Sequence, residues 1–133
     1  MTRINWNKQL EIGNQKIDDQ HQQLIDYLNN LNDAIESGSS TSSVFELLFN
    51  NLVYYSKYHF SDEEKLMAEI NYPGLDHQRT EHEFFINKLA EMQNRFMADE
   101  NIELVVLTFL GDWLVNHIVE EDKKIAAFIK ASK

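Results

Sequence analysis

The segment Tyr58-His59-Phe60-Ser61-Asp62-Glu63-Glu64 places an imidazole and a carboxylate four residues apart, at His59 and Glu63. Residues four apart on an α-helix lie on the same face, one turn from each other, so both side chains can reach one metal ion. The surrounding sequence predicts a helix, because apolar residues recur at steps of three and four from Leu48 to Ile70. Since the pair interrupts an apolar stripe, and burying it without partners is costly, we expect either a His–Glu hydrogen bond or a metal site.

Composition limits both the fold and the chemistry. The 133 residues suit a single domain, and one Pro and four Gly favour long helices over a many-stranded fold. Because Asp and Glu number 22 against 12 Lys and Arg, the net charge of −10 argues against nucleic acid and membrane surfaces as partners. The chain contains no cysteine, so any metal must be held by imidazole and carboxylate groups. With no targeting segment and no run long enough to span a membrane, we expect a cytoplasmic protein.

Hydrophobic periodicity predicts four helices. Residues 1–17 show no helical period and predict an extended arm, held to the rest of the domain by Trp6, Leu10 and Ile12. Helices are expected at about 18–37, 43–71, 75–98 and 102–130, with the second ending before Pro73. Their lengths and short connections predict an all-α, antiparallel up-down-up-down four-helix bundle that forms one domain over residues 1–133.

Every predicted helix carries at least one of the five histidines. In an antiparallel bundle, the start of an odd helix lies beside the end of an even one, so these histidines should meet near one end of the interior. Two carboxylates accompany them, and seven ligands suit two ions that the carboxylates can bridge. The predicted metal ligands are His21, His59, Glu63, His77, His82, His117 and Asp122.

The ordered pattern His21…His59-x-x-x-Glu63…His77/His82…His117-x-x-x-x-Asp122 resembles the hemerythrin family over essentially the whole chain. The length and the Trp6 arm resemble its bacterial single-domain form, the bacteriohemerythrins. This resemblance implies a non-heme di-iron centre that binds O2 reversibly, for storage, transport or sensing. It also implies an open position on the iron at the His21 and His59 side, and a second iron filled by a third-helix histidine pair and His117. Glu63, Asp122 and a solvent-derived oxygen would bridge the two ions.

Reversible binding in such a family transfers two electrons from a di-iron(II) pair to O2 and back, which requires a dry pocket. Apolar residues of this chain match the family's pocket positions, although each also fits an ordinary core. They are Leu24, Phe60, Trp113, Leu114 and Ile118.

The chain departs from the family pattern on the third helix. The family spaces its histidine pair by four residues, whereas His77 and His82 are five apart. On a regular helix a step of five turns a side chain by about 140°, compared with about 40° for a step of four. His77 can still be a ligand, as we expect, if the helix contains a π-bulge or has an unwound first turn. Otherwise Gln78 or water takes its place. The neighbouring acids Glu64, Glu81, Glu120 and Glu121 are expected to face solvent.

The sequence is compatible with two main functions. The first is reversible O2 binding without net reaction, and the alternative is a di-iron redox enzyme that acts on O2, peroxide or nitric oxide. The histidine-rich ligand set favours binding, because ferritin-type enzymes use more carboxylates. A helical interaction module that binds adventitious zinc is a third, less specific possibility.

Overall fold

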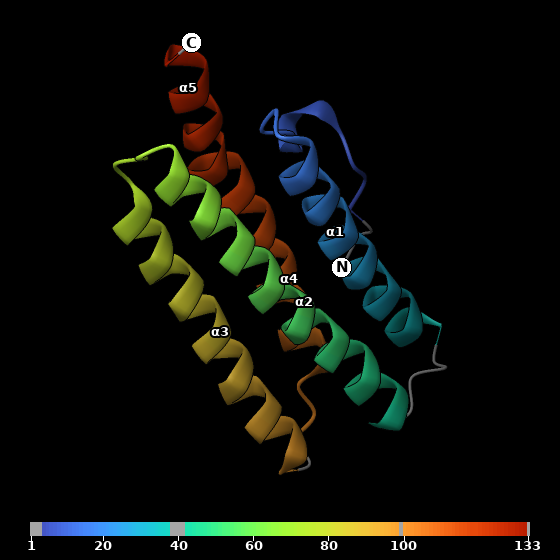
Figure 1. The fold of residues 1–133 in the computed structure, drawn as a ribbon. Coiled ribbons are helices and arrows are strands. Elements are labelled where there is room, and N and C mark those ends of the chain that lie inside the picture. The colour runs from blue at the N-terminus through green and yellow to red at the C-terminus, as the bar shows by residue number, and fades with distance from the viewer. Residues whose placement is uncertain (1–3, 38–41, 99, 133) are drawn as a thin grey trace.

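The computed structural model describes residues 4–37, 42–98 and 100–132 and confirms the predicted all-α four-helix bundle (Figure 1). A short 3-10 turn, η1, precedes the bundle. Each of the four long helical elements of the bundle is called a rod. The fourth rod is continuous but consists of three segments: α4, the π-helical segment η2, and α5. The elements are η1 Lys8–Leu10, α1 Gln15–Glu36, α2 Ser42–Glu69, α3 Leu75–Met97, α4 Glu103–Asn116, η2 His117–Asp122 and α5 Lys123–Ala131.

Successive helices run in opposite directions, as the colour gradient in Figure 1 shows. Helix α1 packs against both α2 and α4, and α2 packs against α3. The beginnings of α1 and α3 therefore lie at the same end of the bundle as the end of α2, η2 and α5. In the described part of the chain, no helix combines the length and the hydrophobicity that a membrane span requires.

Side-chain caps fix where α1 begins. Asn14 Oδ1 accepts a hydrogen bond from the Ile17 N–H at 3.0 Å, so the helix begins at Gln15, three residues earlier than predicted. Asp18 then accepts from the backbone N–H groups of Ile12 at 2.7 Å and Gly13 at 3.2 Å, which holds the preceding arm against the helix. These bonds fix the rotation of α1 and hence the face on which its histidine lies.

The break between α2 and α3 has a defined geometry. Asn71 adopts a positive φ of 57°, and the Tyr72 N–H bonds the Met67 carbonyl at 2.9 Å. This is a Schellman motif, which satisfies carbonyl groups at the end of a helix. Pro73 follows, and α3 begins at Leu75. The connection is short, so the last turns of α2 and the first turns of α3 lie at one level.

The bundle encloses a continuous apolar core. Buried residues from all four rods pack together, and Ile4 and Trp6 of the arm pack against them. Fully buried members include Leu24, Leu28, Phe45, Phe85, Val106 and Ile118.

Candidate metal centre

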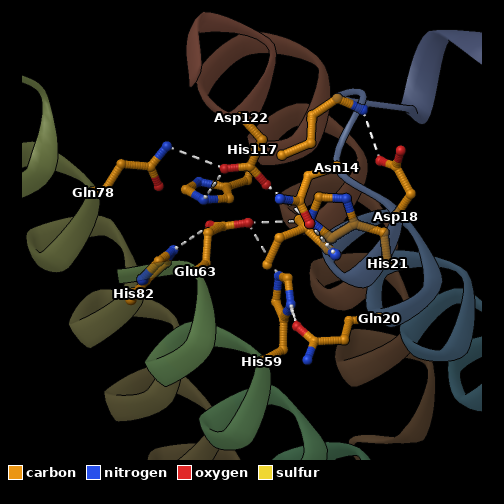
Figure 2. A network of polar contacts seen from close by, with 12 residues as sticks. Asn14, Asp18, Gln20, His21, His59, Glu63, Gln78, His82, His117 and Asp122 are labelled. Carbon is orange, nitrogen blue, oxygen red and sulfur yellow. Dashed lines mark hydrogen bonds and ion pairs between the residues drawn. The ribbon is translucent and has the colours of Figure 1, made fainter. Parts of the chain in front are cut away.

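Six of the seven predicted ligands meet inside the bundle (Figure 2). Helix α1 contributes one histidine, α2 a histidine and a glutamate, α3 one histidine, and η2 a histidine and an aspartate. The side chains are buried, and their nitrogen and oxygen atoms form two adjoining groups. The first group is His21, His59, Glu63 and Asp122; the second is Glu63, His82 and His117.

Glu63 lies between the histidines of three helices. Its Oε2 is 3.2 Å from His21 Nε2 and 3.3 Å from His59 Nε2. Its Oε1 is 3.2 Å from His82 Nε2. The two oxygens of one carboxylate therefore face different groups of imidazoles.

Asp122 repeats this arrangement from the fourth rod. Its Oδ2 is 3.1 Å from His21 Nε2, and its Oδ1 is 3.3 Å from His117 Nε2. The π-helical hydrogen bonding of η2 brings His117 and Asp122, five residues apart, onto one face. The predicted convergence on one end of the interior is confirmed for these six residues.

His77 does not lie in this cluster, so its predicted inward position is wrong. Helix α3 is a regular α-helix from Leu75 onward, and a step of five residues turns His77 away from His82. Its side chain is 60% exposed, and its Nε2 pairs with Glu121 at 3.1 Å. Gln78 takes the inward position: it is 1% exposed, and its Nε2 donates to Asp122 Oδ1 at 3.1 Å.

Two residues that were not predicted at the site orient histidines of the cluster. His59 Nδ1 donates to Gln20 Oε1 at 2.8 Å, and Gln20 Nε2 donates in turn to Asp62 Oδ2 at 2.8 Å. His82 Nδ1 lies 2.8 Å from Glu64 Oε2, so Glu64 contacts a site residue instead of facing solvent as predicted. When Nδ1 carries the proton, Nε2 presents its lone pair to the interior, as metal-bound histidines require.

One of these two residues, Gln20, could have been identified from the sequence. Gln20 lies on the same apolar stripe as Ile17 and Leu24, at steps of three and four, so it is a polar residue at a core position. Glu64 could not have been identified in this way, because its contact with His82 depends on how α3 packs against α2.

Burial and neighbouring charges shift the pKa values of several groups in the cluster. Burial alone would lower the pKa of His21, but contacts with Asp122 and Glu63 outweigh it and raise the pKa to about 10. Burial also acts on His117, yet the Asp122 charge raises its pKa. For His59 burial dominates over Glu63 and lowers the pKa. Burial would raise the pKa of Glu63, but the surrounding histidines hold it well below its usual range. The charged form of Glu63 therefore depends on positive charge beside it.

Buried polar atoms without hydrogen-bond partners indicate whether the interior of the cluster can accept a cation. Among the described residues, several buried atoms that face the centre have no hydrogen-bond partner, which is uncommon in protein interiors. Two donor atoms that bind one ion at about 2.1 Å and at right angles to each other lie about 3 Å apart. The nitrogen–oxygen separations of 3.1–3.3 Å in the cluster are close to this value. The residues thus fit a metal centre. The unpaired atoms are Glu63 Oε1, Gln78 Oε1, His82 Nε2, His117 Nε2 and Asp122 Oδ2.

Aromatic rings cover the α3 and α4 side of the cluster. Phe60 stacks on His82 with ring centres 3.9 Å apart, and Trp113 stacks on His117 at 4.5 Å. A surface cleft of about 400 Å³ between α2 and α3 reaches both Phe60 and His82. Phe60, itself buried, therefore forms part of the cleft wall together with His82, a member of the cluster. Of the other predicted pocket residues, Leu24, Leu114 and Ile118 are buried and Trp113 is half-buried.

The fold and the cluster define a helical-bundle protein with a buried histidine–carboxylate cluster that can hold metal. The Hemerythrin HHE cation binding domain family model matches residues 13–129. Bacteriohemerythrin of Stenotrophomonas maltophilia is 37% identical over 131 residues, which cover 98% of this chain and 84% of that protein. Bacteriohemerythrin of Pseudomonas aeruginosa is 34% identical over 122 residues, covering 92% and 78%. A crystal structure of wild-type hemerythrin matches with a TM-score of 0.86 and 26% identity, over 95% of this chain and 97% of that one. This chain belongs to the hemerythrin family.

Proposed function

We propose that this protein binds O2 reversibly at a di-iron centre held by six side chains. The observation that carries the proposal is the pair of carboxylates, each of which directs one oxygen toward each group of histidines. Family membership supports iron as the metal, and imidazole nitrogens suit it. In this arrangement His21 and His59 would hold one ion, and His82 and His117 would hold the other. Glu63 and Asp122 would each offer one oxygen to either ion.

The centre would supply two electrons to O2 and recover them when O2 leaves. The protein's own residues make that exchange reversible by limiting water and protons. Phe60 and Trp113 shield the ring faces of His82 and His117, while Leu24, Leu114 and Ile118 supply apolar surface. Gln20 and Glu64 fix the Nδ1 protons of His59 and His82, so these rings are not free to release protons into the site.

Repeated oxygenation tests the proposal. The protein is loaded with Fe2+ under argon, exposed to O2 and returned to argon while its visible absorption is recorded. We expect a band that appears with O2, disappears under argon and returns over several cycles, with O2 recovered in the gas phase. A single irreversible change, with no O2 recovered, would contradict reversible binding.

The alternative is a redox enzyme that acts on O2, peroxide or nitric oxide, and the position of Gln78 favours it. A second metal ion with two histidines instead of three is held by fewer nitrogen donors and is therefore more open to reaction. Turnover distinguishes the two functions: an enzyme consumes an added reductant continuously, whereas a carrier consumes none after the first oxygenation.

A further inference from the structure

Gln78 occupies the place that a histidine takes in the family pattern. It lies four residues before His82 on the regular helix α3, so both side chains project from the same face. It is buried, and Figure 2 shows its amide group directed toward Asp122 and the interior of the cluster. The neighbouring imidazole of His77 is outside.

The two ends of the Gln78 amide have different surroundings. The nitrogen donates to Asp122 Oδ1 at 3.1 Å. A carboxylate oxygen only accepts, so this contact fixes which end of the amide is the nitrogen. The remaining atom, Oε1, is buried and has no hydrogen-bond partner within the part of the chain that the structure describes.

Other unpaired atoms surround the same place. His82 Nε2 and His117 Nε2 also lack hydrogen bonds among the described residues, and they belong to the group that Glu63 completes. An amide oxygen is an established ligand of divalent cations, and it adds no charge to a site that already has two carboxylates. Ligation would satisfy an oxygen that is otherwise buried without a partner.

We propose that Gln78 Oε1 is a metal ligand that replaces the third-helix histidine of the family. The inference rests on the proposed two-metal centre. The ion beside α3 then has two imidazoles and an amide oxygen, while the hydrogen bond from Nε2 to Asp122 orients the amide. Because an oxygen donor replaces a nitrogen donor, we expect the ion beside α3 to be held less tightly than it would be with a third histidine in this position.

Co2+ titration of the metal-free protein tests this without any measurement of O2. Equilibrium dialysis gives the number of ions bound, and the visible Co2+ absorption becomes more intense when an ion loses a ligand. Gln78→Leu removes the amide oxygen and replaces the side chain with an apolar one of similar volume. We expect it to weaken one of the two ions by at least about tenfold and to intensify the absorption. His77→Ala is the matched control and should leave both readouts unchanged.

Two more variants separate ligation from the hydrogen bond to Asp122. Gln78→Glu retains an oxygen but loses the N–H donor, so ligation predicts two bound ions and a spectrum like that of the unchanged protein. Gln78→His supplies a nitrogen and should tighten the ion beside α3. If Gln78→Glu behaves like Gln78→Leu, or if Gln78→Leu binds two ions normally, the amide oxygen is not a ligand.

Circular dichroism of each metal-free variant checks that the bundle remains folded. If Gln78→Leu unfolds, the comparison of Gln78→Glu with Gln78→His decides. Failure of the unchanged protein to bind two ions would count against the proposed function itself, and is thereby distinguishable from a failure confined to Gln78.

Discussion

His117 Nε2 and Asp122 Oδ1 lie 3.3 Å apart although five residues separate them in the sequence, because the fourth rod turns as a π-helix between them. The same spacing on α3 gives the opposite result, since His77 and His82 lie on a regular helix and point apart. The π-helical segment thus lets two residues five positions apart reach the centre together, which the regular helix α3 does not.

Removing the charge of Glu63 should abolish the paired site. In Glu63→Gln the shape is kept, but both groups of histidines lose an anionic ligand. We expect the metal content of Fe2+-loaded protein to fall from two ions per chain to less than one, measured by elemental analysis after desalting. Glu120→Gln is the matched control, because Glu120 is exposed on the same π-helical segment as Asp122. Two ions retained in Glu63→Gln would show that Glu63 bridges nothing.

Glu64, the hydrogen-bond partner of His82 Nδ1, should affect metal affinity because it orients this histidine. Glu64→Leu removes the partner of His82 Nδ1, and loss of such an outer hydrogen bond typically lowers metal affinity by about 10–100-fold. Glu64→Gln retains an acceptor oxygen and should lose much less. Competition with a chelator measures both affinities. Equal losses in the two variants would indicate that the charge matters and the hydrogen bond does not.

Phe60 should control access from the surface cleft. Phe60→Leu keeps the core filled but uncovers the face of His82, so we expect faster irreversible oxidation of the O2-bound form. Phe60→Ala should oxidise faster still and lose about 3–5 kcal/mol of unfolding free energy. Decay of the visible band gives the oxidation rate, and urea unfolding gives the stability. The control Phe84→Leu changes an exposed ring on α3; if it accelerates oxidation as much as Phe60→Leu, the effect does not come from the cleft.

Metal removal should reverse the pH dependence of stability. In the metal-free protein the pKa of His21 rises from 6.5 to about 10, and that of His117 also rises. A raised pKa in the folded state stabilises the fold fully below 6.5, and this stabilisation is lost as the pH rises toward about 10. We therefore expect the Tm of metal-free protein to fall over this range, and to fall less in His21→Gln.

Metal-loaded protein should behave differently over the same range, because metal ions bind the deprotonated imidazoles. The stabilisation by metal, taken as the Tm difference between loaded and chelator-treated samples, should increase with pH. A metal-free Tm that rises over the range would contradict the proton-binding role of His21.

Much of this structure follows from sequence periodicity. Apolar steps of three and four residues predicted the four helices, and the level of each histidine along its helix predicted the convergence of His21, His59, His82 and His117. The pattern failed at His77, because spacing alone does not distinguish an α-helical from a π-helical turn. The role of Glu64 also escaped prediction, since it depends on a contact between α2 and α3. Gln20, by contrast, was predictable as a polar residue on an apolar stripe.

Anomalous diffraction at the iron absorption edge, from crystals of the Fe2+-loaded protein, tests the paired centre most directly. We predict two anomalous peaks about 3.5–4 Å apart, one near His21 and His59 and one near His82 and His117, with Glu63 and Asp122 between them. A single peak, or peaks only at the surface near His77 and Glu121, would contradict the two-metal centre.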